Sequence, residues 1–174
     1  MIQFKLTFDK DMEEDWLNDW CQRGWAFKRF CMGFFNFIPC HPGEFIYRID
    51  LVPGTGLRCD DYWGYVSFMK EMGVEVLQRW GRWVYLRKRT EDGPFDVYTD
   101  LDSQIGLYQR MRRLFVWVLI LEVFCAIPSL CLLIMEPSLF LRCVGGVFLL
   151  IVYAFGRAIR RCGQKIQDLE RRRQ

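Results

Sequence analysis

Residues 114–135 read LFVWVLILEVFCAIPSLCLLIM, and their only ionisable side chain is Glu122. As a helix with a rise of about 1.5 Å per residue, this run would be about 33 Å long, which is enough to cross a hydrocarbon core of about 30 Å. Fourteen of its 22 residues are Leu, Ile, Val or Phe. Their transfer to lipid outweighs the cost of about 3 kcal/mol for one central charge. The run is therefore predicted to span a membrane.

A second apolar run covers residues 139–156, where 11 of 18 residues are of the same four types. Its one charge, Arg142, lies near an end, where a long side chain reaches the headgroups. Only residues 136–138 separate the two runs, so we expect an antiparallel transmembrane hairpin. The alternative is a pair of buried helices in a larger soluble fold, but only about 100 other residues are available to cover them.

Basic residues set the expected orientation. Residues 1–100 carry 13 basic and 16 acidic side chains, whereas residues 101–174 carry 11 and 5. The flanking arginines, expected at an anionic inner-leaflet surface, are Arg110, Arg112, Arg113, Arg157, Arg160 and Arg161. The segment between the two runs has neither Lys nor Arg. The positive-inside rule then predicts a multi-pass protein of the inner or plasma membrane, with both termini in the cytoplasm. The amino terminus has no signal-peptide pattern.

Polar residues inside the predicted hairpin are candidates for partner binding. Glu122 lies about 12 Å into its run and Arg142 about 21 Å from the cytoplasmic end of its own. This offset of about 9 Å strains a salt bridge between them, so Glu122 is expected to be protonated or to face a partner helix. Pro128 should kink the first span. In residues 157–174, Ile159, Cys162, Ile166 and Leu169 form a seam typical of a basic amphipathic helix or a short coiled coil.

Residues 1–100 are predicted to form a cytosolic α+β domain, joined to the hairpin by a helical linker at residues 101–113. Apolar and polar residues alternate from Ile2 to Phe8, which indicates a strand with one buried face. A helix follows, capped by Asp9 or Asp11 and ended by Gly24. We expect strands at 25–30, 34–38, 44–52, 74–80 and 82–89, with a second helix from Asp60 or Asp61 to Met72. This order favours a ferredoxin-like, split-βαβ fold.

Few residues suggest chemistry. His41 is the only histidine, which excludes a multi-histidine site within one chain, and its neighbour Cys40 is more typical of a packed turn than of a zinc ligand. The acidic residues from Asp9 to Asp15 suggest a solvated helix start rather than a cation site. No cofactor, metal or catalytic residue is predicted. Arg48 and Asp50 share one strand face and suggest either a structural ion pair or a recognition site. The excess of acidic residues argues against nucleic acid.

Several stretches together resemble a known bacterial family. They are Glu14-Asp15-Trp16-Leu17-Asn18, Gly24-Trp25, Tyr47-Arg48-Ile49-Asp50, Trp83-Val84-Tyr85-Leu86-Arg87-Lys88 and Val97-Tyr98-Thr99-Asp100 with Ser103. The family is that of the domain of unknown function 2812, and the resemblance covers roughly residues 1–110. It implies a cytosolic domain often joined to membrane helices, frequently in bacteria whose neighbouring regulators are of the phenolic-acid-decarboxylase-repressor type. It implies no activity.

From these features we expect a non-enzymatic, membrane-tethered interaction or sensing module. Its expected partners are the lipid bilayer and either a second membrane protein or further copies of this chain. The alternative is a small oligomeric component of transport or permeation, or a transporter accessory, assembled through Glu122 and Arg142. An enzyme is disfavoured because the chain offers no recognisable nucleophile and base.

Overall fold

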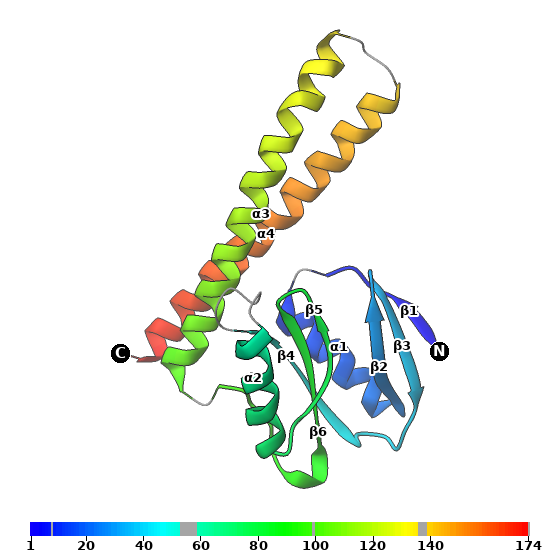
Figure 1. Ribbon diagram of the computed structural model, residues 1–174, viewed down its shortest axis with the longest axis vertical. Coiled ribbons are helices and arrows are strands. Elements are labelled where there is room, and N and C mark those ends of the chain that lie inside the picture. The colour runs from blue at the N-terminus through cyan, green and yellow to red at the C-terminus, as the bar shows by residue number, and fades with distance from the viewer. Residues whose placement is uncertain (8, 53–58, 99, 136–138, 174) are drawn as a thin grey trace. The chain divides into compact units, whose positions relative to one another are not determined.

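The computed structural model describes residues 1–7, 9–52, 59–98, 100–135 and 139–173. The side chains of residues 59–61, 129–135 and 141 are outside this description. The chain divides into two compact units, Met1–Thr99 and Asp100–Gln174. In the described part of the chain, the first unit holds the strands and two α-helices, and the second consists of two long helices (Figure 1).

The elements of the first unit follow the order expected from the sequence. They are β1 (Ile2–Phe4), α1 (Lys10–Gln22), β2 (Trp25–Cys31), β3 (Phe34–Pro39), β4 (Phe45–Leu51), α2 (Cys59–Glu71), β5 (Glu75–Trp80), β6 (Trp83–Arg89) and a short 3-10 turn, η1 (Thr90–Asp92). Asp9 caps α1 as predicted, because its side chain accepts from the backbone N–H groups of Asp11 and Met12.

The strands form two separate three-stranded sheets. The first sheet has the order β1-β3-β2 and the second has the order β4-β6-β5, and all four pairings are antiparallel. The tight connections after β2 and β5 contain Gly33 and Gly81, which both have positive φ angles. Glycine adopts this conformation without steric cost, so each connection closes a local hairpin.

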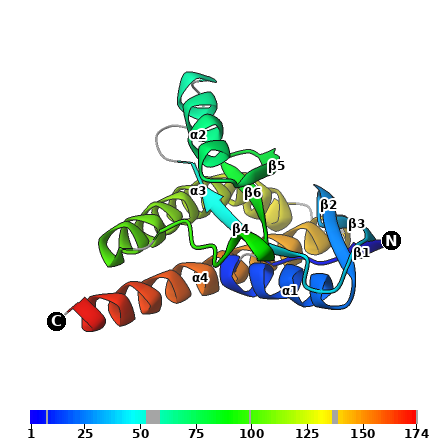
Figure 2. The same cartoon turned by 90° about the horizontal axis from the view of Figure 1, so that it is seen from below.

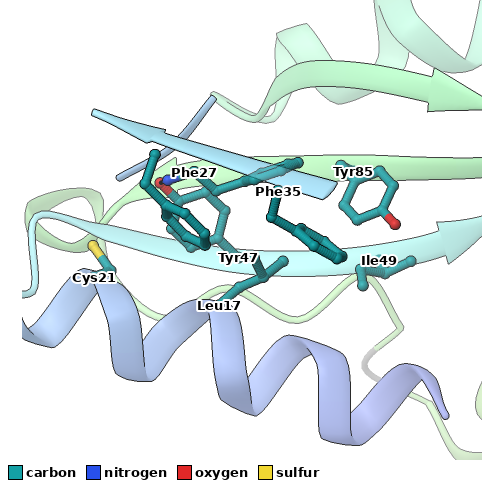
Figure 3. Close-up of a cluster of buried hydrophobic side chains, with 8 residues drawn as sticks. Leu17, Cys21, Phe27, Phe35, Tyr47, Ile49 and Tyr85 are labelled. Atoms are coloured by element: carbon teal, nitrogen blue, oxygen red, sulfur yellow. Dashed lines mark hydrogen bonds between the residues drawn. The ribbon is translucent and has the colours of Figure 1, made fainter. Parts of the chain in front are cut away.

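The helices cover the sheets unequally. Helix α1 packs against both sheets through one cluster of buried side chains: Leu17, Cys21, Phe27, Phe35, Phe37, Tyr47, Ile49 and Tyr85 (Figure 3). Helix α2 packs on the other face of the second sheet, where Met69, Val84 and Leu86 are buried together. Figure 2 shows α1 and α2 on opposite sides of β4 and β6. The second sheet is thus covered on both faces.

A glutamine side chain joins the two sheets. Gln78, at a bulge in β5, accepts from the N–H of Phe30 at 2.7 Å and donates to the carbonyl of Phe30 at 2.7 Å. Phe30 lies in β2, on the edge of the first sheet. The amide group therefore takes the place that a backbone peptide would have in a continuous sheet.

The predicted ferredoxin-like fold is wrong. That fold has one sheet built around crossover connections, whereas the described residues form two small sheets with antiparallel pairings only. The reason is that β2–β3 and β5–β6 pair locally as hairpins, and β1 and β4 add to their outer edges. The period-two patterns predict strands correctly, but they do not specify which strand pairs with which.

The predicted buried face of the first strand is also wrong. Ile2, Phe4 and Leu6 are exposed, while Gln3 and Lys5 are half-buried. Lys5 lies inward because its ammonium group is 4.5 Å from the centroid of the Trp16 ring and donates to the carbonyl of Met12. Phe8, which belongs to the same pattern, lies outside the described residues.

The second unit pairs two antiparallel helices, α3 (Leu101–Met135) and α4 (Leu139–Arg173). Near the chain ends, the predicted seam of α4 packs on the beginning of α3: Ile166 and Leu169 are buried with Ile105. Arg173 forms an ion pair with Asp102 at 3.1 Å. This seam is therefore an intramolecular helix contact.

The predicted two-helix transmembrane hairpin is wrong for the described residues. They contain one helix, Arg142–Arg173, that is long and apolar enough to cross a membrane, and not two. The first apolar run has described side chains from Leu114 to Pro128 only, which corresponds to about 22 Å of helix. It contains Glu122 and follows Arg112 and Arg113. The multi-pass topology and the placement of both termini depended on two spans, so neither has support here.

Candidate functional site

Asp50 and Arg48 lie on the α2 side of β4 and have separate partners. Asp50 is fully buried, and its carboxylate accepts from the hydroxyl groups of Tyr65 at 2.8 Å and Tyr98 at 3.2 Å. Arg48 instead pairs with Asp96 at 3.0 Å. The structural ion pair expected for Arg48 is therefore present. The Asp50 carboxylate is shielded from solvent and supports the fold rather than presenting a recognition group.

The tyrosine partners of Asp50 were not predicted. Tyr65 and Tyr98 lie 15 and 48 residues away in the chain. Burial, followed by the charge of Asp50, strongly raises the pKa of Tyr65, so its hydroxyl remains a hydrogen-bond donor. A tyrosine in a helix carries no sequence signal for such a partner, because its ring fits the apolar pattern equally well.

Two acidic residues at the start of α1, Glu13 and Glu14, are buried rather than solvated, whereas Asp15 is exposed. The Glu14 carboxylate accepts from the backbone N–H of Ile49 at 2.6 Å and from the Lys10 ammonium at 2.8 Å. One helical turn later, the Asn18 amide accepts from the N–H of Tyr47 at 2.8 Å. These side chains occupy the edge of β4 that faces away from β6, so they satisfy backbone groups that an edge strand leaves free.

These hydrogen bonds between α1 and the edge of β4 connect two of the stretches that carry the family resemblance. Glu14 and Asn18 belong to the first stretch, and Tyr47 and Ile49 to the second. The spacing of four residues places both polar side chains on one face of the helix. That spacing was available in the sequence, but the strand edge that they serve was not.

Glu13 is a second buried carboxylate at this helix start. It accepts from the hydroxyl of Tyr85 at 2.7 Å. Burial raises the pKa of Glu13 to about 7, although the Tyr85 hydrogen bond and the charge of Lys5 act in the opposite direction. Among the described residues no group of three or more His, Cys, Asp or Glu side chains is arranged to hold a metal ion.

Cys40 and His41 lie in the turn before β4. The backbone N–H of His41 donates to the Glu44 carboxylate at 3.0 Å. Burial, followed by the neighbouring Cys21 thiol, raises the pKa of Cys40 to about 11. The Cys40 thiol is therefore protonated at neutral pH, and a protonated thiol is a poor nucleophile.

The polar residues of the predicted spans lie on both long helices. Glu122 is half-buried in α3, and its Oε1 atom is shielded from solvent without a hydrogen-bond partner among the described residues. Arg142 is exposed at the start of the candidate membrane helix. The two form no ion pair in the described part of the chain. The helix α3 continues through Pro128.

The basic residues predicted at a membrane surface lie on α3 and α4. Arg112, Arg113, Arg157 and Arg160 are exposed, whereas Arg110 and Arg161 are half-buried. Beyond them, the middle of each helix exposes large apolar side chains. These are Trp117, Ile120, Leu121, Val123, Phe124 and Ile127 on α3, and Val147, Leu149, Leu150 and Tyr153 on α4.

Two other kinds of helix can have this length and composition, a core helix of a soluble protein and a signal sequence, and the candidate membrane helix differs from both. A core helix of a soluble protein is mostly buried, but only 6% of the apolar window in Arg142–Arg173 is buried. A signal sequence lies near the amino terminus, whereas 141 residues precede this helix. The side chains of this window are therefore mostly exposed.

Taken together, these features define a small α+β domain followed by a helical region with one candidate membrane helix. The chain belongs to the family described as Protein of unknown function (DUF2812), whose model matches residues 9–120. The match extends from Asp9, the N-cap residue of α1, to the exposed apolar part of α3. The candidate membrane helix lies beyond it. No curated protein and no solved structure matches the chain.

Proposed function

We propose that this protein is a membrane-tethered, non-enzymatic module that binds a second protein or senses a signal. The observation that carries the proposal is the exposed apolar window of α4, of which 6% is buried. A surface of this kind is stable only when lipid or another protein covers it. Tethering through α4 is the simplest way to cover it.

The buried polar groups of the first unit support a binding rather than a catalytic role. The carboxylates of Glu13, Glu14 and Asp50 each accept hydrogen bonds from the fold itself. A catalytic acid or base needs access to a substrate. These three groups are instead used to hold helices and strands together.

A protein partner is supported by Glu122. Its Oε1 atom lacks a hydrogen-bond partner among the described residues although it is shielded from solvent. A donor from a partner protein would satisfy this atom, because a shielded carboxylate oxygen without a hydrogen bond is costly. We therefore place the partner contact on the apolar part of α3 around Glu122.

Tethering is tested by extracting membranes of the expressing cell with alkaline carbonate. The full chain should stay in the pellet, and Leu149→Arg with Leu150→Arg should move it to the wash, because charges in the apolar window oppose insertion. Gln164→Arg with Gln167→Arg adds the same charges to exposed positions of the same helix and should leave the chain in the pellet. A parent chain found in the wash contradicts the proposal.

Partner binding is tested by photo-crosslinking from position 117, on the apolar part of α3, in intact cells. We expect one defined adduct with a second protein or a second copy, and Glu122→Ala should reduce its yield because the shielded carboxylate then offers no acceptor. Lys70→Ala, at an exposed position of α2, is the control and should leave the yield unchanged. A chain that gives no adduct and turns over a metabolite when purified alone contradicts the proposal.

A further inference from the structure

Among the described residues of the first unit, no helix or strand packs on one face of the first sheet. Its cross-strand register places Arg29, Asn36 and Ile2 in one row and Cys31, Phe34 and Phe4 in the next. Neighbours in register point to the same side of a sheet, and Phe34 and Phe4 are exposed while the alternate Phe35 is buried against α1. We call this side the outer face.

The outer face is apolar where soluble proteins are usually polar. It exposes Ile2, Phe4, Phe34 and, at its rim, Leu6 and Met32. The Phe4 and Phe34 rings are in contact, with centroids 5.1 Å apart. An antiparallel sheet with one face on a core normally turns polar residues outward, so the alternation of β1 is inverted. A contiguous apolar surface of this kind marks an interaction site.

Met32 adds a second observation at the tip of the β2–β3 hairpin. Its φ angle is +46° and that of Gly33 is +88°, a pair typical of a two-residue turn in which Asn or Asp usually precedes Gly. Met32 is 76% exposed. Methionine has neither the polar group nor the conformational preference that suits this position, so its presence costs stability that an apolar contact would offset.

The charge of this sheet indicates what covers it. Residues 1–7 and 25–40 contain Lys5, Lys28 and Arg29 and no Asp or Glu, although residues 1–100 as a whole carry more acidic than basic side chains. Lys28 and Arg29 are exposed. Apolar side chains beside exposed cations match an anionic lipid surface, where headgroups attract the cations and the acyl boundary accepts the apolar groups.

We infer that the outer face of the first sheet docks on an anionic lipid surface, with Phe4, Phe34 and Met32 inserted and Lys28 and Arg29 at the headgroups. The inference rests on the proposed tethering in one respect, because a tether keeps the surface within reach. A second copy fits less well, since the same face would bring the cations of both chains together without an acidic partner.

The test is oxidative footprinting of the full chain, with each methionine resolved by mass spectrometry. The chain is compared in detergent, in phosphatidylcholine vesicles, and in vesicles of equal parts phosphatidylcholine and phosphatidylglycerol. Oxidation of Met32 should fall about fivefold or more in the anionic vesicles, and high salt should restore it. Met72 is 60% exposed, follows α2, and is the internal control that should not change.

Matched variants separate docking from tethering. Phe34→Ser should abolish the protection of Met32, while Phe68→Ser should not, although the two rings are 54% and 55% exposed. Lys28→Glu should also abolish the protection of Met32. Lys70→Glu, at an exposed position of α2, is its control. Because Lys28 is on the surface, its variant is informative even if Phe34→Ser unfolds. Carbonate extraction of each variant reports tethering independently.

Two results would overturn the inference. One is that Met32 is oxidised readily and to the same extent in all three environments, which would mean that lipid does not cover the face. The other is equal protection in all three, including detergent, which would mean that protein covers it, either another part of this chain or a second copy. In both cases the carbonate result for the parent chain still decides the tether separately.

Discussion

The two sheets of the first unit have the same number of strands but different surroundings. The second sheet, β4-β6-β5, lies between α1 and α2, and both of its faces contain fully or largely buried side chains such as Tyr47 and Leu86. The first sheet, β1-β3-β2, has α1 on one face and leaves apolar residues exposed on the other. An apolar face therefore does not by itself identify the core.

The largest expected effect separates the two faces of the first sheet at neighbouring residues of β3. Phe35→Ala should lower the free energy of unfolding by about 3–5 kcal/mol, because it opens a cavity in the core shared with α1. Phe34→Ala should cost about 1 kcal/mol or less, since its ring is already half in solvent. Chemical denaturation of both variants measures the difference. Equal losses would mean that the outer face is part of the core.

The strand pattern of the first residues shows why this difference was not predicted. Ile2, Phe4 and Leu6 alternate with polar residues, and alternation predicts a strand and one apolar face. It carries no information on whether that face meets the chain's own core or another surface. In the fold Lys5 is the side chain that lies inward, because its ammonium group lies over the Trp16 ring.

The next effect concerns the helix that serves both sheets. Glu13 has an ordinary pKa of 4.5 and a pKa of about 7 in the folded protein. Between these pH values the folded state binds more protons, so the free energy of unfolding should fall as pH rises from about 4.5 to 7 and then level off. Glu13→Gln should remove this fall and stabilise the protein at pH 8 by up to about 3 kcal/mol.

Urea denaturation at several pH values between 4 and 8 measures this prediction. The Gln side chain still offers an acceptor to the Tyr85 hydroxyl, so the hydrogen bond is retained in the variant. Glu71→Gln, at an exposed position at the end of α2, is the control and should leave the pH dependence unchanged. A parent protein whose stability rises between pH 4.5 and 7 would contradict the burial of Glu13.

Gln78 tests whether the two sheets depend on each other. Gln78→Ala removes both hydrogen bonds to Phe30, which should cost about 1–3 kcal/mol because a half-buried N–H and carbonyl lose their partner. Hydrogen exchange of the Phe30 amide should accelerate in the variant. Gln109→Ala, exposed on α3, is the control. Unchanged exchange at Phe30 would show that β2 and β5 are held together by packing alone.

The candidate site illustrates the same limit of sequence reasoning. The acidic run before α1 predicts a helix start correctly, and Asp9 is its cap. The expectation of a solvated helix start was wrong for Glu13 and Glu14, because they contact the Tyr85 hydroxyl and the backbone of Ile49, which lie 72 and 35 residues away in the chain. Local charge favours a helix terminus by its dipole, whereas burial is decided by the tertiary partners.

The smallest expected effect lies at the rim of the second sheet, where Arg48 pairs with Asp96 at 3.0 Å. Asp96 is mostly exposed, so solvent screens the pair and its contribution should be below about 1 kcal/mol. A double-mutant cycle of Arg48→Ala and Asp96→Ala measures the coupling directly, and raising the salt concentration should reduce it further. A coupling well above that value would mean that the pair is shielded from solvent in the protein as measured. The α2 side of the second sheet would then be a covered surface, as we propose for the outer face of the first sheet, and the contrast between the two sheets would be lost.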